Sequence, residues 1–253
     1  MIQQEYRTHE IARIIGIHVN TVRFYEKIGF LTAPARSPNG YRVYTQLQLD
    51  QCALIRRAMR AEVLQNGLRT QAVEIVKLCA ALRLDEAYAA AETYRGMIER
   101  EIRNAELAIA TVEDALAQSA SADEAISLKR AETAQRLHIT AETLRTWERS
   151  GLLAVKRRKN GYRVYDAADL KRLNIIRTLR CANYSLSAIL RLLNGLDQRT
   201  AASVEAALNT PEEGESIVSV CDHLIVALGN TRTDAQALLA MIADMRQKYL
   251  TLH

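Results

Sequence analysis

The chain has 253 residues, of which 49% are hydrophobic and 25% are charged, a composition typical of a soluble globular protein with one large domain or two small ones. No apolar run is long enough for a membrane span, and the N-terminus lacks the basic and apolar regions of a secretory signal. These features predict a cytoplasmic protein with no membrane partner.

The net charge of +5 is unevenly distributed along the sequence. Residues 1–60 contain 9 Lys and Arg against 4 Asp and Glu, and residues 126–182 contain 14 against 5, whereas the rest of the chain is acidic. Because basic segments attract polyanions and acidic ones do not, this pattern indicates two separate nucleic-acid-binding modules.

The sequence offers little for metal binding or catalysis. Its four cysteines, at positions 52, 79, 181 and 221, form no C-x-x-C motif, so we expect core residues, no metal site and no cofactor. It also lacks a phosphate-binding glycine loop, a dinucleotide fingerprint, an H-E-x-x-H motif and a nucleophile elbow, so we do not expect an enzyme.

An internal repeat organises the chain. The segment TVRFYEKIGFL at 21–31 recurs as TLRTWERSGLL at 143–153, and NGYRVY at 39–44 recurs letter for letter at 160–165. The two blocks keep their order and are offset by 122 and 121 residues. The sequence therefore predicts a duplicated structural unit whose internal loop is one residue longer in the first copy.

The first part of each copy predicts two short helices joined by a tight turn, which is the helix-turn-helix pattern. The second helix is expected at about 20–28 in the first copy and 141–149 in the second. Thr140 is a good N-cap because its hydroxyl can accept from a free backbone N–H, whereas His18 is a poorer one. Gly29 and Gly151 follow at positions suited to the left-handed conformation.

A β-hairpin wing is expected next in each copy. The Asn-Gly pairs at 39–40 and 160–161 favour a tight turn, and the Tyr-Arg-Val-Tyr that follows alternates as a strand does. A third helix should begin at Thr45 or Asp166, and a fourth is expected at 70–80 and 185–194.

Long helices follow both copies. Apolar residues spaced three and four apart between Leu84 and Leu116 predict one coiled-coil-like helix, and the tail has two shorter seams, at 217–228 and 235–252. The stretches 118–123 and 211–214 are interpreted as breaks. We therefore expect a mainly α fold, with two winged helix-turn-helix domains, small β-hairpin wings and long coiled-coil-like helices. The predicted divisions are 1–82 and 124–197 for the winged domains, 83–120 for the long helix and linker, and 198–253 for a C-terminal helical region.

The N-terminal end of the second helix of each copy should meet base edges in a major groove of DNA. There Arg23 and Arg145 can each donate two hydrogen bonds to a guanine edge or a phosphate. Tyr25 and Trp147 lie one turn further on, where they either donate to a phosphate or pack in the core. The predicted DNA-binding set is Asn20, Thr21, Arg23, Tyr25, Tyr41, Arg42 and Arg60 in the first copy, and Thr140, Thr143, Arg145, Trp147, Arg158, Tyr162, Arg163 and Arg180 in the second.

These motifs resemble the MerR family of bacterial transcription regulators. Members of that family have a helix-turn-helix with Thr-Leu-Arg-aromatic-aromatic-Glu and a wing that ends in Gly-Tyr-Arg-x-Tyr. The resemblance covers about residues 6–80 and 126–196, and departs from the pattern at Thr146, where an aromatic residue is usual. It implies DNA contacts from the helix and wing arginines and from a basic residue late in the third helix. Arg180 fits that last position, whereas Met59 is aligned with it in the first copy and Arg60 is adjacent.

The resemblance also implies a function. MerR regulators bind promoters and distort them so that RNA polymerase fits, and they dimerise through a long antiparallel helix. Two copies in one chain leave two alternatives: an internal pseudo-dimer, with 84–118 antiparallel to 232–250 and recognition helices in successive major grooves, or a homodimer with four modules. An architectural or excisionase-like DNA-bending protein without an effector is the alternative function, and a protein-interaction module is a more remote one.

A small-molecule effector is left open by the sequence. The paired cysteines that the metal-sensing members of the family use are absent. Tyr88, Tyr94, Met97, Cys221 and His223 either line an effector pocket or are ordinary core residues.

Overall fold

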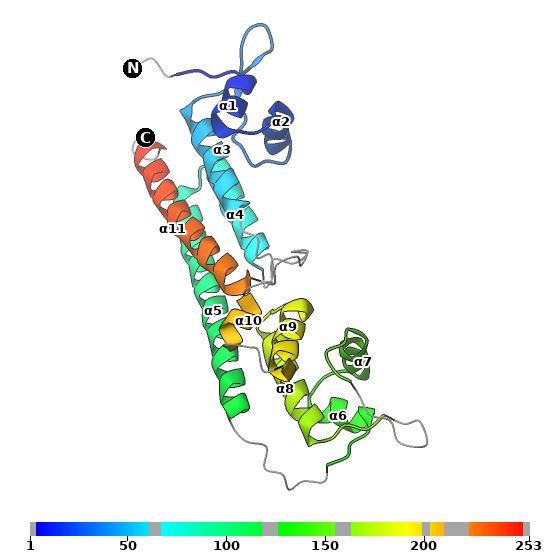
Figure 1. The fold of residues 1–253 in the computed structure, drawn as a ribbon. Helices are drawn as coiled ribbons and strands as arrows, with labels where there is room; N and C mark the ends of the chain where they lie inside the picture. Colours follow the sequence, from blue (N-terminus) through cyan, green and yellow to red (C-terminus); the bar gives the residue numbers. More distant parts are fainter. Residues whose placement is uncertain are drawn as a thin grey trace. The chain divides into compact units, whose positions relative to one another are not determined.

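The computed structural model describes residues 4–60, 67–117, 126–154, 163–198, 203–209 and 223–249, and Figure 1 shows their ribbon. Within these ranges the chain is helical apart from one two-stranded sheet and two isolated bridges, which confirms the mainly α prediction. Contacts divide the chain into two compact units, one of Met1–Arg100 with Leu228–His253 and one of Glu101–Ala227. We call them unit 1 and unit 2, and each is described separately.

Unit 1 contains the first predicted module. Its elements are α1 (Thr8–Ile15), α2 (Val19–Lys27), β1 (Ala35–Arg36), β2 (Arg42–Val43), α3 (Gln46–Ala58) and α4 (Leu68–Ala80). The two strands pair antiparallel, with Ala35 opposite Val43, so the predicted wing is present. The helix-turn-helix and the two helices that follow the wing are also confirmed, within one or two residues of their predicted bounds.

Local chemistry explains the tight turn of this first module. Gly16 ends α1 in the left-handed conformation, with φ of 72°, where a side chain would be strained. His18 then caps α2, because its Nδ1 accepts from the backbone N–H of Asn20 at 3.2 Å. Ile11 and Val22 are fully buried, which locks the two helices together. Ile14 is exposed, because the short α1 buries only a narrow stripe that contains Ile11 and Ala12.

Unit 2 contains the second module. Its helices are α6 (Arg130–Arg136), α7 (Ala141–Arg149), α8 (Ala167–Cys181), α9 (Leu186–Gln198) and α10 (Val204–Asn209). Thr140 caps α7 as predicted, since its hydroxyl accepts from the N–H of Thr143 at 3.0 Å. His138 adopts a φ of 50° at the turn where the first copy has glycine. The tip of the second wing, with the predicted contacts Arg158 and Tyr162, lies outside the described residues.

The long helices follow the predicted seams. Helix α5 (Leu84–Ala117) buries the apolar residues of its seam from Leu84 to Val112. Helix α11 (Leu224–Tyr249) is continuous from the end of the first predicted tail seam through most of the second, so one helix stands where two shorter seams were expected. The two predicted breaks, 118–123 and 211–214, lie outside the described residues. Among the described helices none is both long and apolar enough to cross a membrane.

In unit 1, helix α11 packs antiparallel to the first part of α5 (Figure 1). Near the end of α11, Arg246 pairs with Asp85 at 2.5 Å and lies 5.2 Å from the ring centre of Tyr88. Nearer the middle of α11, Asp234 acts on Tyr94, whose pKa is raised to about 12, chiefly by burial and then by this carboxylate. The order of these contacts along the two helices fixes their opposite directions.

Each unit also joins a module to the helix that follows the other module in the sequence. In unit 1, helix α11 holds α3 through Asp234, which accepts from Arg57 at 2.8 Å, and through Tyr249, which donates to Asp50 at 2.9 Å. In unit 2, the second part of α5 reaches the end of α8, where Asn183 donates to Glu101 at 3.2 Å. Each long helix thus contacts the module that it does not directly follow in the sequence: α11 contacts the first module and α5 the second.

The buried seam of α11 should carry much of the stability of unit 1. We expect Leu238→Ala to lower the free energy of unfolding by about 2–5 kcal/mol, because this side chain is fully buried and its loss leaves a cavity. The matched variant Leu107→Ala removes the same atoms from a side chain that is 67% exposed, so it should change stability by less than about 0.5 kcal/mol. Urea denaturation followed by circular dichroism checks both, and equal losses would contradict the packing described here.

Candidate nucleic-acid interface

We call α2 and α7, the second helices of the two helix-turn-helix pairs, the recognition helices. The N-terminal end of α2 presents polar and charged side chains. Asn20 and Arg23 are exposed, and Thr21 is half-buried. Val22 on the opposite face is fully buried and fixes the orientation of the helix. The geometry therefore leaves these three predicted side chains free to approach a DNA groove.

Helix α7 repeats this arrangement in the second module. Leu144 is fully buried, whereas Arg145 is exposed at the place that Arg23 takes in the first copy. The hydroxyls of Thr140 and Thr143 lie 2.8 Å apart at the start of the helix. Thr140 is engaged in capping, so Thr143 and Arg145 are the better placed of the predicted contacts.

The aromatic residues one turn further on are less available to DNA. Trp147 is only 5% exposed, which favours the alternative that its ring belongs to the core of the module. Tyr25 is half-buried, its ring stacks on Phe30 at a centroid distance of 6.3 Å, and burial raises the pKa of its hydroxyl. The structure thus gives Tyr25 an accessible edge and leaves Trp147 little surface with which to reach a phosphate.

The wing arginines bind the recognition helices. Nε of Arg42 lies 2.6 Å from Oε2 of Glu26, and this hydrogen bond raises the pKa of the guanidinium. In the second module, Nε of Arg163 lies 3.1 Å from Oε2 of Glu148. Both arginines therefore position the wing against the helix, a role that the prediction of direct DNA contact did not include.

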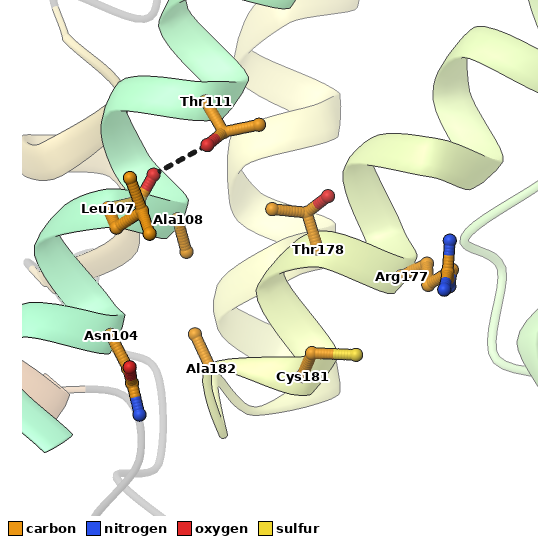
Figure 2. A pocket seen from close by; sticks show the side chains of 8 residues that line it. All are labelled: Asn104, Leu107, Ala108, Thr111, Arg177, Thr178, Cys181 and Ala182. Atoms are coloured by element: carbon orange, nitrogen blue, oxygen red, sulfur yellow. Dashed lines mark hydrogen bonds between the residues drawn. The ribbon is translucent and has the colours of Figure 1, made fainter. Parts of the chain in front are cut away.

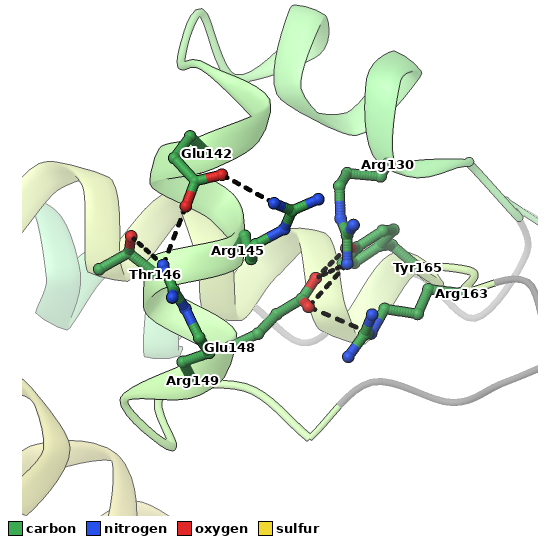
Figure 3. Close-up of polar contacts among 8 residues, drawn as sticks. All are labelled: Arg130, Glu142, Arg145, Thr146, Glu148, Arg149, Arg163 and Tyr165. Atoms are coloured by element: carbon green, nitrogen blue, oxygen red, sulfur yellow. Dashed lines mark hydrogen bonds and ion pairs between the residues drawn. The ribbon is translucent and has the colours of Figure 1, made fainter.

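Glu148 is the centre of a larger cluster than Glu26 (Figure 3). Its side chain is 6% exposed and accepts from Arg163, from Arg130 at 2.9 Å and from the hydroxyl of Tyr165. The pKa of Tyr165 is raised to about 12, first by burial and then by its hydrogen bond to the carboxylate. Position 8, which the repeat aligns with Arg130, is a threonine in the first module, so the carboxylate of Glu148 has a cationic partner that Glu26 lacks.

A cleft of about 470 Å³ lies between the wing and the helices of the first module. Its basic residues come from three elements: Arg7 precedes α1, Arg23 lies on α2, and Arg42 lies on the wing. Tyr41 on its rim is 67% exposed, and the guanidinium of Arg7 lies 6.0 Å from its ring centre. Converging cations at a helix N-terminus suit a phosphate of the DNA backbone.

A second cleft, of about 590 Å³, lies beside the recognition helix of the second module. Thr143 and Thr146 line one side, and Arg177 and Arg180 of α8 line the other. A guanidinium N–H of Arg180 donates to the carbonyl of Tyr184 at 2.5 Å, which holds the side chain near the start of α9. The predicted late-helix cation is therefore present beside α7.

The first module has no arginine at the position that corresponds to Arg180, and the nearest cation is Arg60. Arg60 is exposed, and its Nε lies 3.7 Å from Oδ2 of Asp234 on α11. Arg60 thus has an acidic neighbour within the protein, unlike Arg180, whose guanidinium donates to a backbone carbonyl. Met59, which the repeat aligns with Arg180, cannot replace it.

The described residues that the sequence suggested for an effector site, namely Tyr88, Tyr94, Met97 and His223, do not line the grooves described here. A groove of about 480 Å³ lies between α5 and the end of α8, where Leu107 and Ala108 face Thr178 and Ala182 (Figure 2). It is lined by none of the suggested tyrosines, methionine and histidine, and Cys221 lies outside the described residues. Among the described residues, no three His, Cys, Asp or Glu side chains gather as metal ligands would.

Comparisons with known proteins agree with this geometry. A model of the MerR family regulatory protein matches residues 7–44, and a model of the MerR HTH family regulatory protein matches residues 129–196. Each match falls on one of the two modules.

Both modules therefore resemble regulators of the MerR family.

Among curated MerR relatives, the HTH-type transcriptional regulator CueR of Escherichia coli is 47% identical over 49 residues, which cover 19% of this chain and 36% of the relative. The mercuric resistance operon regulatory protein of Bacillus cereus is 32% identical over 83 residues, 33% of this chain and 58% of the relative. The chain thus spans 36% of the length of the first of these relatives. Both are named as regulators, which agrees with the expectation that the chain is not an enzyme.

One solved structure is also similar. The crystal structure of HiNmlR, a MerR family regulator lacking the sensor domain, bound to promoter DNA, is 23% identical and has a TM-score of 0.28. The similarity covers 50% of this chain and 80% of that chain.

Sequence reasoning missed several exposed side chains of the recognition helices. Phe24 is exposed beside Arg23, and Lys27 is exposed one turn further along. In the second module Arg149 is exposed and shares the partner Glu142 with Arg145. The 3.6-residue period of the helix could have identified all three, since each lies three or four residues from a predicted contact.

The unequal anchoring of the two wings can be tested with isosteric variants. We expect Glu148→Gln to lower the free energy of unfolding of the second module by about 1–3 kcal/mol, because two arginines lose a charged partner. Glu26→Gln affects one arginine at a more exposed carboxylate, so about 1 kcal/mol or less is expected.

The chain has a single tryptophan, Trp147, and its burial in the second module makes its fluorescence a local probe. The denaturation midpoint of this signal should fall for Glu148→Gln and stay unchanged for Glu26→Gln. A larger shift for Glu26→Gln would show that the cluster does not anchor the second wing.

Proposed function

We propose that the chain is a sequence-specific regulator that binds double-stranded promoter DNA through two winged helix-turn-helix modules, each bound to one half of an operator. The observation that carries this proposal is the duplicated arginine, Arg23 and Arg145. Each is exposed near the start of its recognition helix and lies in the aligned position of the repeat. Arginine at this place of a helix in the major groove donates to the O6 and N7 atoms of guanine.

The surroundings of the two arginines support backbone binding on both sides. The cleft beside Arg23 also contains Arg7 and Arg42, and the cleft beside α7 contains Arg177 and Arg180. Phosphate contacts of this kind position a recognition helix, and base contacts then supply specificity. Each module therefore has both parts of a complete half-site reader.

We further propose that the two halves of the chain form an internal pseudo-dimer. The support is the reciprocal exchange of helices: α11 follows the second module but holds α3 through Asp234, and α5 follows the first module but reaches Asn183. MerR proteins use a long antiparallel helix pair between two chains, and the packing of α11 on α5 resembles that pair.

Similarity to the MerR family also suggests how such a protein acts. We propose that binding distorts a promoter so that RNA polymerase can engage it. Bending or underwinding of a site of this length costs on the order of 1–6 kcal/mol, which added protein contacts offset. The wings, which are held to the recognition helices by Arg42 and Arg163, are the elements suited to press on the flanking backbone.

Selection of bound sequences from random DNA at fixed salt tests the assignment. Arg23→Ala and Arg145→Ala should each relax base preference in a different half of the selected site, at a cost of about 1–3 kcal/mol in binding. The matched control is Arg95→Ala, which removes an exposed arginine with a helical glutamate neighbour on α5. It should leave base preferences unchanged.

If both recognition-helix variants lose the same binding affinity for every sequence, the modules bind DNA only by attraction to its phosphates. If the selected sites lie at recombination sites of the genome and not at promoters, an excisionase-like bending role replaces the regulatory one.

The internal pseudo-dimer predicts the mass of the free protein. Light scattering should give a mass near that of one chain, 28.4 kDa. A mass twice as large would instead indicate a homodimer with four modules.

A further inference from the structure

An acidic side chain stands at the DNA-facing end of the second recognition helix. Glu142 is the second residue of α7, directly after Ala141, and its side chain is 61% exposed. In the free protein a carboxylate at a helix N-terminus is stabilised by the helix dipole. In a DNA complex the same carboxylate would face the negative charge of the phosphates, so its presence there needs a specific reason.

Glu142 is connected to both exposed arginines of the helix (Figure 3). Its Oε2 accepts from Arg145 at 3.1 Å, and its Oε1 accepts from Arg149 at 2.9 Å. Because Glu142 contacts Arg145, the two side chains lie on the same face of the helix. Arg145 is the residue proposed to meet base edges. A groove that admits Arg145 therefore also admits Glu142.

The first module has a different residue at this position. The repeat aligns Glu142 with Asn20, Arg145 with Arg23 and Arg149 with Lys27. Both modules thus have two cations at these positions, whereas the remaining position is an amide in the first module and an acid in the second. A difference in chemistry at a base-facing position is what two unequal half-sites would require.

The chemistry of the major groove distinguishes these two side chains. An asparagine can pair with adenine through N6 and N7, whereas a carboxylate only accepts and is suited to the N4 amine of cytosine. The O4 of thymine and the O6 and N7 of guanine are acceptors and would repel it. The carboxylate of Glu142 and the guanidinium of Arg145 therefore match a cytosine, which offers an amine, next to a guanine, which offers two acceptors.

We propose that Glu142 is a specificity-determining residue that accepts a hydrogen bond from the exocyclic amine of a cytosine. The half-site of the second module then carries cytosine where that of the first module carries the adenine chosen by Asn20. This inference rests on the proposed function, because it requires α7 to lie in a major groove.

Sequence selection with the full chain at fixed salt tests the proposal. The wild-type protein should select a site whose halves differ at this position, with cytosine favoured about fivefold or more in one half. E142Q should replace that cytosine by adenine, since glutamine pairs with adenine as asparagine does. The reciprocal variant N20E should place cytosine in the other half.

The control variant is E86Q. Glu86 is also an exposed helical acid paired with an arginine three residues away, but it lies on α5 outside both modules. E86Q changes the net charge as E142Q does and should leave the base frequencies of both halves unaltered.

The outcomes separate the two levels of inference. If the wild-type protein enriches no sequence, the proposed function itself fails. If it enriches a site but E142Q only tightens binding to all sequences, as removal of any acid near DNA would, then Glu142 is merely the partner of the two arginines and the specificity proposal is overturned. Enrichment of adenine opposite Glu142 in the wild type would overturn it as well.

Discussion

The ion pair between each wing and its recognition helix is the interaction on which the DNA-binding surface depends. A two-stranded wing with strands of two residues has too few hydrogen bonds to hold its own position. Arg42 and Arg163 supply the missing constraint, because their guanidinium groups bind Glu26 and Glu148 on the recognition helices. The ion pair ties the wing to the helix, so in the proposed DNA complex a groove contact made by the helix would also place the wing near the backbone.

The wing arginines Arg42 and Arg163, which come from identical hexapeptides, lie in different surroundings. In the second module Arg130 adds a second cation to the carboxylate cluster, whereas the first module has Thr8 at that place. The cap of the recognition helix changes from His18 to Thr140, and the cleft beside it gains the cation Arg180. The wing hexapeptide is thus the same in both copies, whereas the charged and capping residues around it differ. Such differences suit binding to unlike half-sites.

Much of this architecture follows from local pattern. The seam of α5 was predictable because burial repeats every three or four residues, and the turns at Gly29 and Gly151 because few other residues adopt their φ angles. The partner of Arg42 was not, since a strand residue meets Glu26 only after the chain has folded back over 16 residues. The burial of Trp147 and the short α10 likewise depend on tertiary packing.

The covalent link between the modules has a consequence for binding. Two modules on separate identical chains must present the same surface to both halves of a site, and their association depends on protein concentration. In the proposed internal pseudo-dimer, the second module is always present at a high effective concentration, so weak binding by either module alone suffices. Each module can then change independently, as Asn20 and Glu142 illustrate. The ion pair of Asp234 with Arg57 joins α11 to α3 within unit 1 and involves neither Asn20 nor Glu142, so a change at these two positions leaves that contact intact.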